Sequence, residues 1–250
     1  MTCLLALMFL YLSCAASASE SVRLTATLSP EHLGHSTTVG FRFEIASQTG
    51  RVPPPLVAVE IRYPGNLGFA LSGLGLATCA PATLAVLGPK GCPANSRMGF
   101  GTAAAQMEVE HSIVPEAAEV SIVRGPTRDG HLALLFYVNG LEPVSAQIVI
   151  PGLLIPARLP FGGAVALDVP LVPSWPEGPY VSIVSLLSTL GPEHLTYYEH
   201  VKGKVVAYNP QGVLLPKVCP RGGFQFAGSF LFADGAKANS RTAVACPKKH

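Results

Sequence analysis

The chain has 250 residues, of which 49% are hydrophobic and 13% are charged, and its formal net charge is +2. With 25 glycines and 23 prolines, the composition excludes a coiled coil or helical bundle, and the high apolar content excludes intrinsic disorder. Because the 17 basic and 15 acidic residues nearly balance, we expect no nucleic-acid partner.

The N-terminus has the pattern of an export signal. Residues 4–12 form an apolar run that is too short to cross a membrane as a helix, and Ala16-Ser17-Ala18 supplies the small residues of a cleavage site. We therefore expect residues 1–18 to be a signal peptide. Residues 1–3 lack the usual basic side chain, which leaves open a start site upstream, and a lipid on Cys14 is the alternative to cleavage.

The chain after residue 18 is expected to be secreted, extracellular or held at the cell envelope. Its most apolar stretch, residues 148–172, is interrupted by four prolines and so predicts no integral membrane span.

The first predicted elements are strands. Residues 39–45 and 57–63 alternate with period two and carry β-branched and aromatic side chains, which is typical of strands. Residues 132–138 (LALLFYV) are apolar on both faces, so we expect this strand to be central and covered on both sides. Asp129-Gly130 and Asn139-Gly140 predict the turns on either side of it. Further strands are predicted at 120–124, 144–150, 181–187, 204–208 and 213–215.

The C-terminal segment predicts a hairpin. Phe224, Phe226, Phe230 and Phe232 share one face of a strand, and Asp234-Gly235 turns the chain into a returning strand. A stacking platform for nucleic acid is the alternative for these phenylalanines, but few cations accompany them, so we expect them to form core.

A single short helix is predicted at residues 81–87, which begin with proline and end before Gly88. A short sequence also occurs twice: residues 27–33 (TLSPEHL) and 189–195 (TLGPEHL) are nearly identical. We interpret it as chance or as two similar turns at strand ends.

Four cysteines remain after residue 18, namely Cys79, Cys92, Cys219 and Cys246. An even number in an exported chain predicts two disulfides, with three pairings open. We favour the local pairs Cys79–Cys92 and Cys219–Cys246, since the second would close the open end of the hairpin. A zinc site of four thiolates is the alternative, but the spacings of the cysteines do not match the short pairs of zinc knuckles.

About a dozen short strands with Gly/Pro turns predict an all-β fold of the β-sandwich class. The sequence leaves open whether this is one continuous domain over residues 19–250 or two packed Ig-like domains, over 19–112 and 113–250.

The order of motifs resembles a known group of proteins. Cys79 is followed by Cys92-Pro93-x-x-Ser96-x-x-Gly99, and Cys219-Pro220 is followed by Cys246-Pro247. This order is similar to that of uncharacterised secreted β-rich proteins of high-GC Gram-positive (actinobacterial-type) bacteria, which carry a C…CPxxSxxG motif and a late cysteine pair. The resemblance covers nearly all of the chain after residue 18 and implies a secreted, β-rich protein. The group has no established activity, so the resemblance implies no catalytic residues.

The sequence assigns no catalytic residue, metal ligand or cofactor. For a hydrolase acting on a polysaccharide or ester, the candidates are Asp129 with His131, and Glu108 with Glu110 on one strand face. The first pair is better explained by a solvated turn. The second, with Glu116 and Glu119 nearby, is better explained by a polar strand edge that faces solvent. We interpret His32 and His35 as part of a turn rather than as metal ligands.

Aromatic residues in stiff loops form the candidate binding surface, which comprises Trp175, Tyr180, Tyr197 and Tyr198. The alternative for Trp175 is that it caps the end of the core. Our first hypothesis is a non-enzymatic exported protein with a structural or binding role, whose partners are cell-wall polymer or other surface proteins. A hydrolase and a carrier of an apolar ligand between the sheets are the alternatives.

Overall fold

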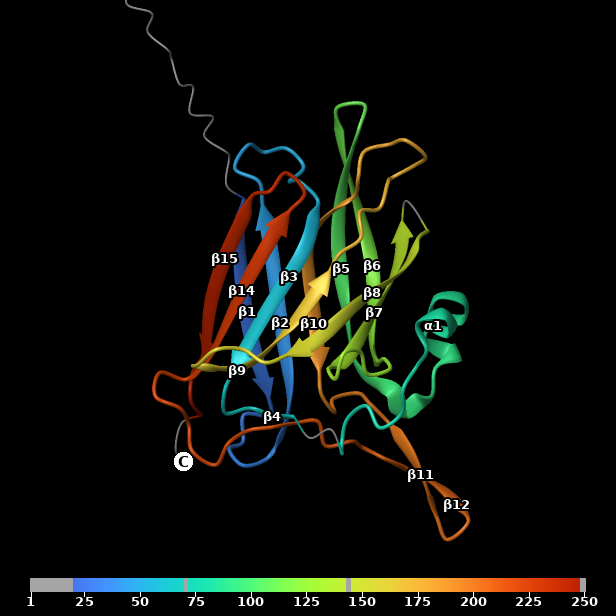
Figure 1. Cartoon of the computed structure of the whole chain (residues 1–250), viewed down its shortest axis with the longest axis vertical. Helices are drawn as coiled ribbons and strands as arrows, with labels where there is room; N and C mark the ends of the chain where they lie inside the picture. The colour runs from blue at the N-terminus through green and yellow to red at the C-terminus, as the bar shows by residue number, and fades with distance from the viewer. Residues whose placement is uncertain (1–19, 70–71, 143–144, 248–250) are drawn as a thin grey trace, which may run out of the picture.

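The computed structural model of the chain describes residues 20–69, 72–142 and 145–247 (Figure 1). Its elements are predominantly strands. The predicted signal peptide, residues 1–18, and Cys14 lie outside the described residues, so both remain predictions.

The strands and helices follow one another along the chain with short connections. The strands are β1 (Ser21–Ser29), β2 (Ser36–Ala46), β3 (Leu56–Pro64), β4 (Gly68–Phe69), β5 (Arg97–Val109), β6 (Ser112–Arg124), β7 (Leu132–Glu142), β8 (Gln147–Ile155), β9 (Phe161–Asp168), β10 (Ser182–Leu190), β11 (Tyr197–Val201), β12 (Lys204–Tyr208), β13 (Val213–Leu214), β14 (Phe224–Phe232) and β15 (Lys237–Val244). The helical elements are α1 (Pro81–Leu87) and two short 3-10 helices, η1 (Gly88–Gly91) and η2 (Ala94–Ser96).

One antiparallel sheet of 13 strands contains all of these strands except β11 and β12, which pair with each other. Its order is β15-β14-β3-β9-β8-β7-β6-β5-β10-β2-β13-β4, and β1 also pairs with β2. The sheet rolls until β1 lies beside β15, where the Leu24 amide donates a hydrogen bond to Ser240 Oγ at 3.0 Å. Strands that are distant in the order therefore face one another across the interior.

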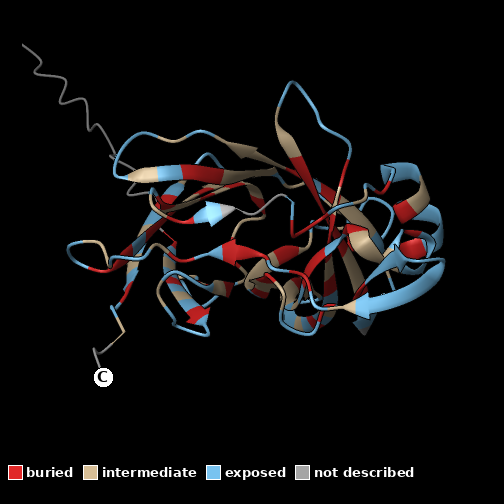
Figure 2. Cartoon of the chain, turned by 90° about the horizontal axis from the view of Figure 1, so that it is seen from below, coloured by how far each residue is buried: buried red, intermediate tan, exposed pale blue. Residues whose placement is uncertain are grey.

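The packing across this interior resembles that of a sandwich whose layers are continuous with each other. Phe43 on β2 and Phe230 on β14 meet edge to face with ring centroids 5.2 Å apart. Buried residues lie mainly along the strands, and the loops around them are mostly exposed (Figure 2). The all-β prediction is confirmed. The boundary proposed at residues 112 and 113 falls at the start of β6, which pairs with β5 from Ser112 to Val123.

The predicted C-terminal hairpin is confirmed. Its four phenylalanines on β14 are buried, and the chain turns at Asp234-Gly235 into β15. Cys219 and Cys246 form a disulfide at the open end of the hairpin, with their Cα atoms 5.9 Å apart. Cys79 and Cys92 form the other, with a Cα separation of 5.2 Å, so the favoured pairing is confirmed and leaves no thiolate of the four for zinc.

The two similar heptapeptides mark strands that flank the same segment. β1 and β10 lie on opposite sides of β2, and Thr27 and Thr189 are both paired with Gly40. A Cβ atom on Gly40 would lie 2.4 Å from Thr27 Oγ1, so a larger residue at this position would require the Thr27 side chain to move. Both heptapeptides continue past the ends of their strands, as the interpretation of two similar strand ends requires.

The apolar outer face of β7 explains why its sequence is hydrophobic throughout. Leu134 and Phe136 point into the interior, whereas Leu135 and Tyr137 are buried on the outer face. The outer residues pack against Leu84 of α1 and against the Cys79–Cys92 disulfide. The predictions of a central strand and of a helix at 81–87 are therefore confirmed. The turn predicted at Asn139-Gly140 is wrong, because β7 continues to Glu142 and Asn139 pairs with Gln147 of β8.

The sequence predicts no strand at four places where the structure has one, namely β1, β4, β9 and β11, and prolines obscure the full length of β6 and β8. Pro115 lies in β6, but β7 pairs with β6 only from Ala117 onward. Pro151 lies in β8, but β9 pairs with β8 only from Gly152 onward. Each proline thus occupies a part of its strand that has a neighbour on one side only, which is where sheets tolerate proline.

The packing of α1 against the outer face of β7 can be tested by substitutions at two positions of this helix. Leu84 is fully buried, whereas Val86 is 79% exposed. We expect Leu84→Ala to lower the free energy of unfolding by about 2–5 kcal/mol, because it leaves a void between α1 and β7. Val86→Ala should change it by less than about 0.5 kcal/mol. Urea denaturation measures both, and equal effects would contradict this packing.

Candidate functional site

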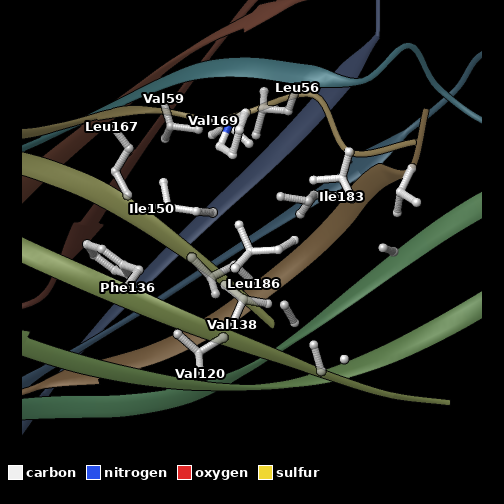
Figure 3. Close-up of a pocket in the computed structure, with 18 of the residues that line it drawn as sticks. Leu56, Val59, Val120, Phe136, Val138, Ile150, Leu167, Val169, Ile183 and Leu186 are labelled. Atoms are coloured by element: carbon white, nitrogen blue, oxygen red, sulfur yellow. The ribbon is translucent and has the colours of Figure 1, made fainter. Parts of the chain in front are cut away.

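A cavity of about 140 Å³ lies inside the rolled sheet (Figure 3). Its wall comes from strands on all sides of the interior, from β2 and β3 through β5 to β10. The side chains that point toward it in Figure 3 include Leu56, Val59, Val120, Phe136, Val138, Ile150, Leu167, Val169, Ile183 and Leu186. The wall is almost entirely apolar, so the space suits hydrocarbon rather than a polar molecule.

Small residues leave this space unfilled. Ala103 on β5 and Ala118 on β6 are paired across the two strands, and both line the cavity. Ala105, Gly140 and Ala146 line it as well. Alanine and glycine are unusual in strands because they contribute little packing, and at these inward positions they stop short of the opposite wall.

The cavity reaches the surface beneath the loop that joins β9 to β10. Pro170 and Pro173 of this loop line the cavity and are exposed. The loop is held as a narrow arch, in which the Val181 amide donates to the Val172 carbonyl at 2.9 Å and Ser174 Oγ donates to the Pro179 carbonyl at 2.7 Å. The mouth of the cavity is therefore an ordered structure.

A smaller cavity of about 40 Å³ continues the apolar interior. It shares Phe41, Ile61, Phe136 and Leu167 with the larger one, so these four side chains stand between the two spaces. Ile122 of β6 lines the smaller cavity, whereas Val120 of the same strand lines the larger one.

Two of the four predicted binding aromatics lie beside the mouth. Trp175 and Tyr180 are 44% and 48% exposed, and both belong to the arch over the cavity. The Trp175 ring also covers Gly178, where a Cβ atom would lie 2.6 Å from the indole. Tyr198 is 49% exposed but belongs to β11, at the opposite end of the sheet (Figure 1).

Tyr197 corrects the predicted surface, because its side chain is fully buried. Its hydroxyl accepts a hydrogen bond from the Gly75 amide at 2.7 Å and donates one to the Arg97 carbonyl. Burial raises the pKa of this phenol above its ordinary value of 10.0, and the bond from Gly75 offsets part of that rise. Alternation within β11 explains the difference, since neighbouring side chains point to opposite faces.

The candidate hydrolase residues do not converge on one place. Glu108 forms an ion pair with Arg51 at 3.1 Å at one end of β6, and Asp129 and His131 lie in the turn beyond its other end. The two sets are separated by the length of β6, roughly 40 Å for a strand of this size. Glu110 does not share a strand face with Glu108, because β5 ends at Val109 and Glu110 lies in the turn with a φ of 46°.

In the described parts of the chain, no group of three or more His, Cys, Asp or Glu side chains is placed to hold a metal ion. Nor does any helix among the residues described have the length and apolar character needed to span a membrane.

Glu116 was expected on a solvent-facing edge and instead lines the cavity, with only 8% of its surface exposed. Glu119 on the same strand is exposed. Inward positions on β6 include Glu116, Ala118 and Val120. Because alternate residues of a strand share one face, counting back from the apolar Val120 predicts that Glu116 also points inward. The alanines at 103, 105 and 118 were the missed signal of an unfilled interior.

No family model matches the sequence, and no curated protein matches it.

The buried hydroxyl of Tyr197 can be separated from its ring by Tyr197→Phe. We expect this change to lower the free energy of unfolding by about 1–3 kcal/mol, because it leaves the Gly75 amide and the Arg97 carbonyl without this partner. Tyr198→Phe, at an exposed neighbour, should change it by less than about 0.5 kcal/mol. Chemical denaturation at neutral pH compares the two variants.

The variant Tyr197→Phe also tests how the stability of the protein depends on pH. Because the folded-state pKa of Tyr197 is raised, unfolding releases a proton between the ordinary and the raised pKa, and stability falls as the pH rises through that window. Tyr197→Phe should therefore lose less stability than the unmodified protein above pH 10.0. An unchanged slope would show that this phenol is not buried.

Proposed function

We propose that the protein is an exported, non-enzymatic binding protein that holds the hydrocarbon part of a small amphipathic molecule inside its rolled sheet. The observation that carries this proposal is the apolar cavity that opens beneath the arch over residues 172–181. The two disulfides and the resemblance to secreted β-rich proteins support the export part of the proposal.

The volume of the cavity limits what it can hold. An apolar cavity of about 150 Å³ in another protein stays dry and binds benzene, and the space here is 140 Å³. Pockets that enclose whole drug-sized molecules measure roughly 300–1,000 Å³. A short length of alkyl chain therefore fits inside, and the rest of the ligand would lie at the mouth.

The site is pre-formed, which favours binding. The strands of the wall are fixed by their ladders, and the arch is held by its own hydrogen bonds. Binding would then order little of the protein and would cost mainly the freedom of the ligand. The gain is the apolar surface of the chain removed from water.

A variant that fills the cavity tests this proposal. Ala118→Leu places a larger side chain inside, and Ala117→Leu places the same side chain on the exposed face of the same strand. We expect 1-octanol to bind the unmodified protein, which isothermal titration calorimetry measures. Ala118→Leu should weaken binding by at least about tenfold, and Ala117→Leu should leave it within about twofold.

Stability distinguishes a filled cavity from a damaged fold. Ala118→Leu should keep or raise the melting temperature, since it occupies empty apolar space. Failure of the unmodified protein to bind 1-octanol or any other alkyl ligand would overturn the proposal. Equal binding by both variants would place the alcohol elsewhere.

A second candidate function is attachment to cell-wall polymer through the exposed aromatics of the arch. Trp175 and Tyr180 lie on one rigid loop, and such side chains stack on sugar rings. We expect purified cell wall to sediment the unmodified protein, and the double change Trp175→Ala/Tyr180→Ala to reduce the bound fraction severalfold. Tyr198→Ala, at the other end of the sheet, should leave the bound fraction unchanged, and an equal loss there would contradict this surface.

A further inference from the structure

The hairpin of β11 and β12 stands apart from the rolled sheet and projects from one end of it (Figure 1). Lys202 and Gly203 form its two-residue turn, with φ values of 49° and 77°, as a type I′ turn requires. Val201, Val205 and Val206 are 41%, 62% and 41% exposed. Apolar side chains gathered on an exposed element mark an interaction surface.

The base of this hairpin is anchored to the body of the protein. The buried ring of Tyr197 meets the ring of Tyr208 edge to face, with centroids 6.0 Å apart. Beside it, the Asn95 side chain donates a hydrogen bond to the Tyr198 carbonyl at 2.8 Å and accepts one from the Tyr198 amide at 2.8 Å. The hairpin is therefore pre-formed, and a partner that docks on it would have little of this chain to order.

The contact with Asn95 also identifies which backbone groups of β12 point outward. Because the backbone groups of Tyr198 turn to Asn95, they point away from β12, and Tyr198 and its partner Ala207 form a pair without hydrogen bonds to each other. Hydrogen-bonded and non-bonded pairs alternate along an antiparallel ladder, so the N–H and C=O groups of Ala207 and Val205 point away from β11. Among the strands of the described chain, only β11 pairs with β12.

This open edge is complementary to itself. When two copies of β12 are aligned antiparallel about a two-fold axis at Val206, all five residues of the strand are paired. Val205 of one copy then lies opposite Ala207 of the other, and such a pair exchanges both of its N–H···O=C bonds. Lys204 lies opposite Tyr208, so a cation meets an aromatic ring and no like charges meet.

The edge of β11 does not offer the same pairing. Asn95 already occupies the backbone groups of Tyr198 on that side. A two-fold alignment about the middle of β11 would also place Glu199 opposite Glu199, and like charges directly opposite each other destabilise a sheet. The pattern of charge and of free backbone groups therefore favours β12.

We propose that the protein forms a two-fold dimer in which the open edge of β12 pairs with β12 of a second copy, so that the two hairpins make one antiparallel sheet. Isologous contacts of this kind are the commonest in homo-oligomers. No described residue of β12 lines either cavity, so the inference is independent of the proposed function.

Sedimentation equilibrium of the intact protein over a series of concentrations tests the dimer. The unmodified protein should have the mass of a dimer at high concentration. Val206→Lys brings two like charges together at the axis, whereas within its own hairpin the new lysine lies opposite Glu199 and is tolerated. We expect it to raise the dissociation constant at least about tenfold. Val218→Lys makes the same change at a valine that is 77% exposed and outside the hairpin, and should leave the constant within about twofold.

A mixing experiment tests the position of the two-fold axis. Val206→Glu should also weaken the dimer, again because like charges meet at the axis. An equimolar mixture of Val206→Lys and Val206→Glu brings opposite charges together, and should associate at least about threefold more tightly than either variant alone. A variant that only damaged the fold would not be rescued by mixing.

Each further outcome decides for or against the pairing. A monomeric mass at every concentration up to about 1 mM would overturn it, as would an undiminished dimer of Val206→Lys or a mixture no tighter than its components. A monomer that floats with phosphatidylglycerol vesicles would assign the exposed valines and lysines to a lipid surface and likewise overturn it. Should the variants unfold, hydrogen exchange of the Val205 and Ala207 amides in the unmodified protein still decides, because pairing slows both as the concentration rises.

Discussion

The meeting of β1 with β15 is the contact on which the rest of the structure depends. An open sheet of this size would leave unpaired edges and would expose its apolar face. Here the sheet rolls, and the bond from the Leu24 amide to Ser240 Oγ joins its two sides. This brings β2 opposite β14, as the contact of Phe43 with Phe230 shows. The interior exists because one sheet faces itself.

Rolling buries one face of each strand but leaves the outer face of β7 to be covered separately. That cover is α1, a helix of seven residues, which is too short to be stable in isolation. The Cys79–Cys92 disulfide closes the loop that contains it and itself packs into the same cluster. The disulfide therefore restricts the conformations of the loop that contains α1 in the unfolded chain. In the folded chain it contributes apolar surface to the cluster.

Incomplete packing is what distinguishes the interior near the arch. Protein cores normally fill their space closely. Here Ala103 and Ala118, which are paired on neighbouring strands, extend only methyl groups into the interior and leave the cavity unfilled. Glu116 lines the same space, with 8% of its surface exposed. The unfilled space is the observation on which the proposed binding function depends.

Local features of the chain determined much of the fold. Period two, the Asp-Gly turns and the Pro-to-Gly segment at 81–87 were sufficient to predict strands, hairpins and the helix, since each depends on neighbouring residues alone. The spacing of the cysteines also favoured the observed pairs. The four phenylalanines of β14 were predicted as core for the same reason.

Tertiary structure decided what no local pattern contains. The orientation of Tyr197 and of Glu116 depends on which face of each strand turns inward, and that is set by partners far along the chain. The cavity likewise arises from side chains on strands that are separated in sequence, so no single segment could reveal it. The sequence by itself determined the strands and their turns, and only the rolling of the sheet decided which residues share an interior, because burial is a property of the whole assembly of strands.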